Sequence, residues 1–306
     1  MTLHTSKIRR SLLNWYARHG RSGLPWRARR SPYHTLVSEF MLAQTQVSRV
    51  IPHFETFVGR FPDFTALANA SLADVVRAWK GLGYNSRAVR LKAVADAVVA
   101  HHGGSMPTDT PALRSLPGVG AYTAAAIRAF AFNLDDAPVD TNIRRVVHRL
   151  RFGIEHPPRA SANELGTYAR KLVPRGRAHD WNSSLMDLGA TICTARAPGC
   201  TRCPVQGSCA AAPIDPAALE RERTAASRRA RAPSVPFEKT ARFARGRIVD
   251  RLRALAPGER ISLLDLHRVL APLLPSRDVH DVGVLVTSLE RDGLVARDGD
   301  RISLRE

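Results

Sequence analysis

Lysine is scarce in this chain of 306 residues, and the five lysines are Lys7, Lys80, Lys92, Lys171 and Lys239. Lys plus Arg nevertheless total 46 against 27 for Asp plus Glu, which gives a formal net charge of +19. Nearly all of the positive charge is therefore arginine, whose planar guanidinium suits two-pronged contacts to phosphate. Such an excess favours a polyanionic partner, most commonly nucleic acid. The plainer alternative is a solvated basic surface on an arginine-rich protein.

Long apolar runs are also missing. No stretch of about 18 apolar residues occurs, so we expect no membrane span and no membrane partner. The first residues lack the apolar core of a signal peptide, which predicts a cytoplasmic location that includes the nucleoid. The length allows two or three compact domains.

Few segments alternate with period two, so the predicted class is mainly α. Between residues 210 and 236 the composition changes to that of a basic linker or solvated arm, and beyond it three helices and a hairpin with Asp298-Gly299 at its turn predict a winged-helix-like domain. The helices expected from apolar spacing and from Gly and Pro punctuation are 11–19, 32–57 with a break at Pro52, 72–79, 86–101, 121–132, 142–151, 161–172, 181–192, 241–255, 262–270 and 278–292.

Cysteine is absent outside one short segment, where Cys193, Cys200, Cys203 and Cys209 follow the spacing C-x6-C-x2-C-x5-C. In a reducing compartment four thiols so close together predict a metal site, and disulfides are not expected. The spacing alone allows either tetrahedral zinc or a cubane iron–sulfur cluster.

The segment Leu116-Pro-Gly-Val-Gly120, with Asp140 twenty residues beyond, points to phosphate chemistry. The glycines allow close approach of backbone N–H groups, and a helix predicted to begin near Ala121 adds the positive end of its dipole. A carboxylate close to such a phosphate-binding site can act on the nucleotide whose phosphate is bound, which predicts an enzyme that acts on DNA. Taken alone, Asp140 is equally well explained as the N-cap of the helix over 142–151.

Glu39 is a second candidate acid. It lies among Leu36, Val37, Phe40 and Met41, so we expect it to be buried and its pKa to be raised. An ordinary surface glutamate is the alternative, against which the apolar neighbours argue. Enzymes that hydrolyse a glycosidic bond usually use two carboxyl groups.

Together these features resemble the helix-hairpin-helix DNA glycosylases, most closely the MutY-type adenine glycosylases, over roughly residues 5 to 211. The motifs that carry the resemblance are Leu24-Pro-Trp-Arg27, Ser38-Glu-Phe-Met-Leu-Ala-Gln-Thr-Gln-Val47, Gly81-Leu-Gly-Tyr84, Leu116-Pro-Gly-Val-Gly120, Val139-Asp-Thr-Asn142, Met186-Asp-Leu-Gly-Ala190 and the four cysteines. It implies a two-lobed fold with an iron–sulfur domain (1–24 and 134–211), a six-helix domain (25–133), a basic linker (212–236) and a winged-helix-like domain (237–306).

The resemblance assigns roles to the catalytic candidates and to the cysteines. Glu39 protonates the leaving base, Asp140 stabilises the oxocarbenium ion, and the cysteines hold a [4Fe-4S] cluster in preference to zinc. Tyr122 stands where relatives with lyase activity carry a Schiff-base lysine, and no lysine lies between Lys92 and Lys171. A monofunctional glycosylase is therefore expected.

The implied partner is double-stranded DNA containing a mismatch or lesion, bound by a monomer. The residues implied to contact DNA or the base are Gln44 and Tyr84 as wedges in the base stack, Gly118 and Gly120 on phosphate, Asn142 and Arg27 on DNA, and Trp26, Leu42 and Ser183 in the base pocket.

Two departures leave the excised base open. Asn182 is followed by Ser183, where MutY-type enzymes usually carry a longer Gln or Glu that contacts adenine, and Ala43 replaces the first Gln of a usual pair. The tail after Val235 is also too short for the domain with which those enzymes read 8-oxoguanine. The leading hypothesis is removal of adenine opposite guanine or 8-oxoguanine. The alternative is a glycosylase of the same superfamily that removes thymine, uracil or another altered base from mismatches, and the third is a non-enzymatic DNA-binding protein.

Overall fold

The computed structural model describes residues 3–156, 158–230 and 235–306. These residues form two compact units, each built from several segments of the chain. Unit 1 comprises residues 1–35, 108–114 and 119–232, and unit 2 comprises residues 36–107, 115–118 and 233–306. Within the described ranges, no helix is long and apolar enough to cross a membrane.

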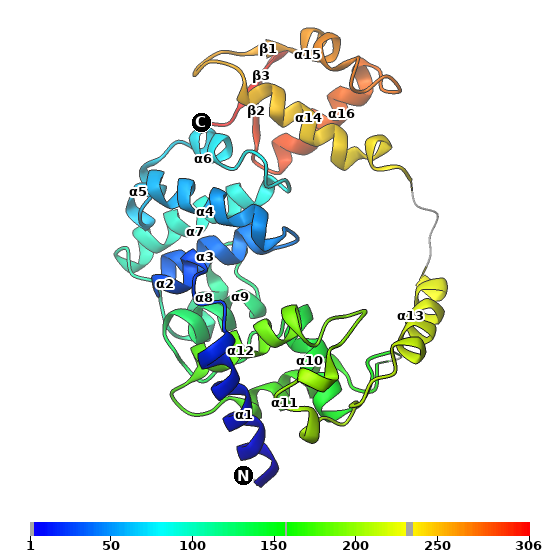
Figure 1. The fold of residues 1–306 in the computed structure, drawn as a ribbon. Helices are drawn as coiled ribbons and strands as arrows, with labels where there is room; N and C mark the ends of the chain where they lie inside the picture. Colours follow the sequence, from blue (N-terminus) through cyan, green and yellow to red (C-terminus); the bar gives the residue numbers. More distant parts are fainter. Residues whose placement is uncertain (1–2, 157, 231–234) are drawn as a thin grey trace. The chain divides into compact units, whose positions relative to one another are not determined.

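Unit 1 is helical, and its core lies among α1, α10, α11 and α12 (Figure 1). Apolar residues repeat along one face of each of these helices, and the faces pack around the fully buried Trp181. Its elements are α1 (Leu3–His19), α2 (Pro25–Ala28), α8 (Thr110–Ser115), α9 (Ala121–Ala126), the π-helix η1 (Ile127–Ala131), α10 (Thr141–Arg151), α11 (Ala162–Leu172), α12 (Ala178–Thr191), the 3-10 turns η2 (Cys200–Arg202) and η3 (Gln206–Ser208), and α13 (Pro216–Ala230).

Unit 2 contains the second group of helices and the whole C-terminal segment. In the first part, Trp79 is fully buried against Phe57, with their rings 5.9 Å apart. Its helices are α3 (Pro32–Leu42, whose first turn belongs to unit 1), α4 (Val47–Arg60), α5 (Phe64–Asn69), α6 (Leu72–Ala78) and α7 (Ser86–His102).

The C-terminal segment forms the three helices and the hairpin that its sequence predicts (Figure 1). Strand β3 is the centre of an antiparallel sheet of order β1-β3-β2, in which Ile261 pairs with Ile302 and Val295 with Leu304. The short first strand was not anticipated. The elements are η4 (Phe237–Lys239), α14 (Ala241–Arg253), β1 (Ile261–Ser262), α15 (Leu263–Leu270), α16 (Val279–Arg291), β2 (Val295–Asp298) and β3 (Arg301–Leu304).

The predicted break at Pro52 is wrong. Pro52 lies inside α4, whose buried Val50, Phe54 and Phe57 hold the helix together despite the missing N–H. The chain breaks earlier, between α3 and α4, where Gln44 has a φ of 62° that no helix can accommodate.

Two further segments differ from expectation. The helix predicted over 121–132 changes from α to π geometry at Ile127, and the expected linker over 212–236 contains α13. The two units also follow boundaries other than those inferred from the sequence, and the division into an iron–sulfur and a six-helix domain stays a prediction.

Candidate functional site

Asp140 in unit 1 is a half-buried carboxylate held by several donors. It is the N-cap of α10, as one sequence interpretation predicted, and its Oδ1 accepts a hydrogen bond from the backbone N–H of Ile143 at 2.6 Å. Its Oδ2 accepts from the side-chain amide of Asn142 at 3.2 Å. Burial raises the pKa of Asp140 above its ordinary value, although these hydrogen bonds and the charge of Arg145 act in the opposite direction.

A chain of polar contacts leads from Asp140 to the cysteine segment. Asn142 donates to Asp140 and accepts from Arg145 Nη2 at 2.9 Å. Arg145 in turn donates to the carbonyl oxygens of Cys193, at 2.8 Å, and Gly189, at 2.7 Å. The cysteine segment and the carboxylate are therefore held in one orientation by the first two turns of α10.

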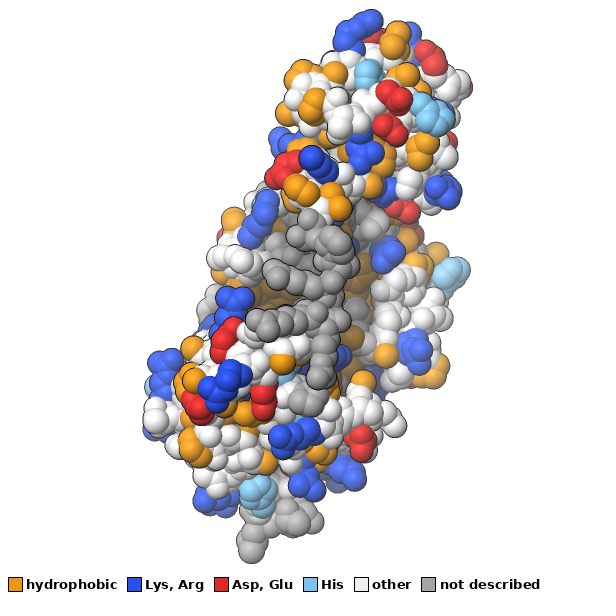
Figure 2. Space-filling model, turned by 90° about the vertical axis from the view of Figure 1, so that its right-hand side faces the viewer, with side chains coloured by type: hydrophobic (Ala, Val, Ile, Leu, Met, Phe, Trp, Pro, Cys, Tyr) orange, Lys and Arg blue, Asp and Glu red, His pale blue; other side chains and the backbone are white. Residues whose placement is uncertain are grey.

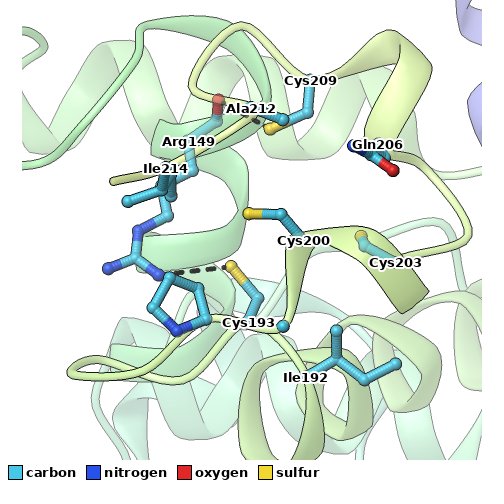
Figure 3. A pocket seen from close by; sticks show the side chains of 11 residues that line it. Arg149, Ile192, Cys193, Cys200, Cys203, Gln206, Cys209, Ala212 and Ile214 are labelled. Carbon is cyan, nitrogen blue, oxygen red and sulfur yellow. Dashed lines mark hydrogen bonds between the residues drawn. The ribbon is translucent and has the colours of Figure 1, made fainter. Parts of the chain in front are cut away.

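The four cysteines line one small cavity in unit 1 (Figure 3). Ile192, Ile214 and the stem of Arg149 close its sides. Cys193 follows the end of α12, and the other three cysteines lie in and beside the two 3-10 turns. Backbone bonds from Ala210 and Ala211 to the carbonyls of α10 hold the last turn in place.

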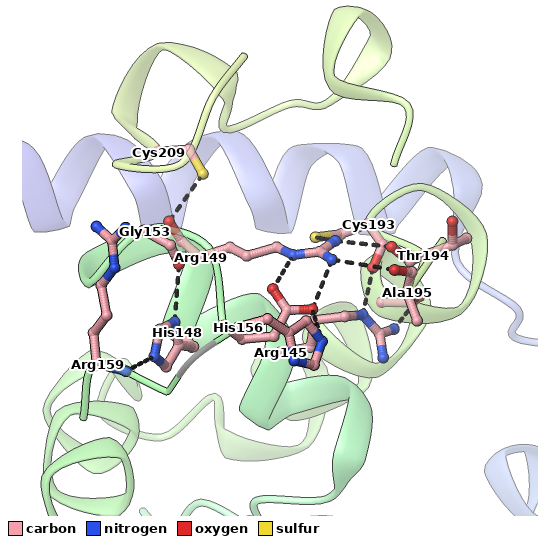
Figure 4. Close-up of polar contacts among 12 residues, drawn as sticks. Arg145, His148, Arg149, Gly153, His156, Arg159, Cys193, Thr194, Ala195 and Cys209 are labelled. Atoms are coloured by element: carbon pink, nitrogen blue, oxygen red, sulfur yellow. Dashed lines mark hydrogen bonds and ion pairs between the residues drawn. The ribbon is translucent and has the colours of Figure 1, made fainter. Parts of the chain in front are cut away.

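Arg149 is fully buried beside this cavity (Figure 4). Its guanidinium forms a two-pronged ion pair with Glu155, at 2.6 and 2.7 Å, and donates to Cys193 Sγ at 3.5 Å. Cys209 Sγ lies 3.2 Å from the Arg149 carbonyl oxygen, to which it donates. Burial would lower the pKa of Arg149, but Glu155 and the Cys193 thiol outweigh it and raise the pKa. A permanent positive charge therefore faces the cysteines.

The cysteine side chains fit a thiolate-bound group. Burial raises the pKa of Cys193, of Cys209 and, to about 11, of Cys203, and neighbouring thiols add to the rise for Cys203 and Cys209. Four thiolates crowded in this cavity therefore need a positively charged group among them. Across the described part of the chain, no three His, Cys, Asp or Glu side chains gather closely enough to hold a single metal ion.

Arg27, expected to contact DNA, is engaged elsewhere. Its guanidinium grips Asp187 of α12 at 2.8 and 3.1 Å, and Arg21 holds the same carboxylate at 2.7 Å. The Asp187 side chain is completely buried. Burial alone would raise its pKa, but the hydrogen bonds and charges of Arg27 and Arg21 lower it. This pairing favours a structural role for Arg27, and a DNA contact stays a prediction without support from the geometry.

Of the residues predicted to line the base pocket or to take part in catalysis, Trp26 and Tyr122 in unit 1 are half-buried and Ser183 is buried. Trp26 lies in the short helix α2, and Tyr122 lies in the first turn of α9. Ser183 is buried on α12, and its hydroxyl has no hydrogen-bond partner in the described structure. A buried hydroxyl without a partner is costly, so this position is suited to a buried water.

In unit 2, Glu39 and Leu42 lie on α3. The Glu39 side chain is half-buried, while its neighbours Val37, Ser38 and Phe40 are buried. The predicted burial of Glu39 is therefore only partial, because its neighbours are buried but Glu39 itself keeps access to solvent. Leu42, also half-buried, is the last residue of the helix.

Arg87 joins the end of α3 to the turn that carries Tyr84. One guanidinium nitrogen donates to the carbonyls of Phe40, Met41 and Ala43, at 2.7 to 2.9 Å. The other donates to the carbonyls of Leu82 and Gly83, at 2.9 and 3.0 Å. Burial lowers the pKa of Arg87 to about 10, with Arg242 acting in the same direction and Tyr84 against it. This cation replaces the missing N–H partners at the end of α3.

The two turns held by Arg87 both have strained backbones. Gln44 has a φ of 62° and is exposed, and Tyr84 has a φ of 44° and is half-buried. Non-glycine residues in this region are uncommon and concentrate at functional sites. Both positions are those expected from the sequence to insert into DNA.

The glycine segment has two different glycines. Gly118 has a φ of 76°, which only glycine adopts readily, and a Cβ there would lie 3.1 Å from Arg90. Gly120 has an ordinary φ of −84° and is the N-cap of α9, which begins at Ala121 as predicted. Both are exposed.

Comparison with known proteins identifies the family. The profile of the HhH-GPD superfamily of base excision DNA repair proteins matches residues 37–171. A solved structure of a thermostable thymine-DNA glycosylase is 32% identical to this chain, with a TM-score of 0.62, over 67% of this chain and 95% of that one. This chain belongs to the HhH-GPD superfamily.

Curated relatives are more similar in sequence but longer. The adenine DNA glycosylase of Mycolicibacterium smegmatis is 46% identical over 195 residues, which are 63% of this chain and 66% of that protein. The human adenine DNA glycosylase is 42% identical over 214 residues, 67% of this chain and 39% of that protein. The matched region thus spans less than two thirds of either relative.

Sequence reasoning missed Arg87, Arg145, Arg149 and Asp187. Each is a charged residue on an otherwise apolar helical face, and that pattern was a usable signal. The partners could not be predicted, because the carbonyls and the sulfur that Arg87, Arg145 and Arg149 contact lie 44 to 48 residues away in the sequence.

Proposed function

We propose that this protein is a monofunctional DNA glycosylase that removes mispaired adenine, opposite guanine or 8-oxoguanine. The observation that carries the proposal is the half-buried, hydrogen-bonded carboxylate of Asp140, in a chain that is 42 to 46% identical to adenine DNA glycosylases over about 200 residues. Double-stranded DNA is the proposed partner, and Lys and Arg side chains on the face in Figure 2 support it.

In the proposed reaction, Glu39 donates its proton to a ring nitrogen of the flipped adenine, which makes the base a better leaving group. The ionised Asp140 stabilises the positive charge that develops on the sugar as the glycosidic bond breaks. The backbone donors of α10 and Asn142 aim the carboxylate. Water then adds to the sugar and gives up a proton to the Glu39 carboxylate, which restores its acid form. Because Tyr122 offers no amine, no Schiff base forms.

Four thiolates of Cys193, Cys200, Cys203 and Cys209 would hold a [4Fe-4S] cluster in this scheme. When bound, such a cluster supplies the positive charge that buried thiolates require and cross-links the cysteine segment. The four cysteines line one cavity, which supports a bound group that cross-links them, and the resemblance to the MutY-type glycosylases favours a cluster over zinc.

We assign Gln44 and Tyr84 to the DNA wedge, Gly118, Gly120 and Asn142 to the DNA contact, and Trp26, Leu42 and Ser183 to the base pocket. The strained turns at Gln44 and Tyr84 support the first of these assignments. Asn142 also has a second task, since it orients Asp140.

The second candidate is a thymine or uracil mismatch glycosylase. It is favoured by the match over 95% of the thymine-DNA glycosylase structure and by the short side chain at Ser183. Both candidates use the same carboxylates, so the excised base distinguishes them.

The test is single-turnover incubation with a labelled duplex holding adenine opposite 8-oxoguanine. We expect strand cleavage only after alkali, no product with Glu39→Gln, and no covalent trapping by borohydride. Trapping would contradict the monofunctional assignment, and a duplex that stays intact after alkali would contradict the enzyme assignment.

A further inference from the structure

A groove in unit 2 is lined by both strained turns and by α14 of the C-terminal segment. Its volume is about 820 Å³. The turns contribute residues 44–46 and 81–86, and the C-terminal segment contributes Phe237 and much of the polar face of α14. We call it the α14 groove.

The α14 groove is strongly cationic. Its lining includes one acidic residue, Asp250, and five arginines: Arg49, Arg242, Arg245, Arg247 and Arg253. Asp250 is already paired with Arg247 and Arg253, and Arg245 is paired with Asp292. Within the described residues, Arg49 and Arg242 form no ion pair, and both are exposed. An anion entering the groove therefore meets two cations with no competing carboxylate.

Aromatic rings stand beside these cations. The Arg242 guanidinium lies 3.8 Å from the centre of the Tyr84 ring and 5.5 Å from that of Phe237. Phe237 is half exposed and its ring lies 5.5 Å from that of Phe243, nearly edge-on. Guanidinium groups over exposed rings are the combination with which proteins bind unpaired nucleotides, because bases stack and phosphates pair.

The walls of the α14 groove are fastened to each other. Arg253 of α14 donates to the carbonyl of Val76, at 2.9 Å, and to the side chain of Asn85, at 2.8 Å. Gly293 lies against Val89 of α7, where an added Cβ would meet the valine at 3.5 Å. The C-terminal segment thus presents a fixed α14 face beside the Tyr84 turn.

We propose that the α14 groove binds a nucleotide of the DNA next to the wedge, and that Arg242 is the residue that holds it. The base stacks on the guanidinium–aromatic group of Arg242 and Phe237, and the phosphate pairs with Arg49 and Arg242. The C-terminal segment therefore binds DNA through α14. The identification of the anion as DNA rests on the proposed function.

The experiment measures binding of the full-length protein to a fluorescein-labelled duplex with a single A·8-oxoguanine mismatch, by anisotropy at about 150 mM salt. We expect Arg242→Ala to weaken binding about tenfold and to reduce the salt slope by about one counterion. Arg242→Lys keeps the charge but not the planar group that stacks, so its affinity for DNA should lie between those of the unaltered protein and Arg242→Ala. The matched control is Arg268→Ala, an exposed arginine on α15 outside the groove.

The proposal is overturned if Arg242→Ala binds DNA as tightly as Arg268→Ala. It is also overturned if Arg242→Ala binds more tightly than the unaltered protein, because Arg242 would then obstruct the access of DNA to Tyr84. Phe237→Ala, which removes the ring without altering charge, should weaken binding with an unchanged salt slope. Thermal melts verify that each variant is folded. The test reads binding and not base excision. If the protein releases no adenine but binds DNA more weakly as Arg242→Ala, the proposed function is refuted and the proposal for the α14 groove stands.

Discussion

At the scale of single residues, the chemistry depends on how buried charges are held. Asp140 is kept ionisable by donors that only α10 supplies, although burial raises its pKa. Asp187 has the opposite balance, because two arginines outweigh its burial. The raised pKa of Asp140 is thus typical of a carboxylate that takes part in a reaction, whereas the lowered pKa of Asp187 is typical of one that stabilises the fold.

Asp140→Asn separates catalysis from capping, because Asn caps a helix about as well as Asp. We expect the single-turnover rate to fall by about 10²-fold or more while the thermal midpoint changes little. In the unaltered enzyme the rate should fall on acidification as Asp140 is protonated, and this should begin at a higher pH than for an ordinary aspartate because its pKa is raised. A large drop in the thermal midpoint with a retained rate would assign Asp140 to capping alone.

Asp187→Asn should lower the free energy of unfolding at pH 7 by about 3 kcal/mol, because Arg27 is left buried without its partner. The pKa of Asp187 is lowered in the folded protein, so its stabilisation is complete above the pKa of the unfolded chain and is lost as pH falls through the folded value. Denaturant titrations should therefore show the two proteins converging in acid. Asp96→Asn, on an exposed pair, is the control and should cost less than about 0.5 kcal/mol. An equal cost for both variants would contradict the account.

At the scale of elements, arginines at helix ends and turns organise the site. Arg87 collects the carbonyls at the end of α3 and fastens them to the Tyr84 turn. Arg145 does the same between α10 and the end of α12. These contacts keep two strained turns and one carboxylate in place without a regular sheet around them.

Arg87→Ala should destabilise the protein by about 3 kcal/mol, since several buried carbonyls lose a charged donor together. Chemical denaturation measures the loss. Arg90→Ala, an exposed arginine on the same helix, should stay within about 0.5 kcal/mol. A stability of Arg87→Ala equal to that of the control would show that the two turns are held by other contacts.

Most elements were predictable because apolar spacing encodes a helix locally. The ends of α7, α10 and α12 were anticipated within three residues, and Asp140 was recognised as a cap. Pro52 misled, because proline breaks a helix only where packing does not compensate. The contacts of Arg87 and Arg145 were beyond reach, since they join residues more than 40 positions apart and leave no local pattern.

At the scale of the whole molecule, the family match covers residues 37–171, and both the four cysteines and the C-terminal residues of the α14 groove lie beyond that range. The domain division, the monomeric state and the nucleoid location stay predictions.

Removal of one cysteine tests the cluster. The purified protein should be brown, with iron and sulfide in equal amounts, and Cys200→Ser should lose both colour and resistance of unit 1 to proteolysis. The control Ser208→Ala changes a buried hydroxyl in the same segment without removing a thiol. A colourless protein that contains zinc would contradict the cluster.

The central claim is that Glu39 and Asp140 serve the removal of adenine. The most direct measurement compares single-turnover rates on duplexes that differ in one pair: adenine opposite 8-oxoguanine or guanine, and thymine or uracil opposite guanine. The account predicts fast release of adenine, alkali-dependent strand breaks, and little reaction with either pyrimidine. Preferential release of thymine or uracil, by an enzyme that remains active as Glu39→Gln, would contradict it.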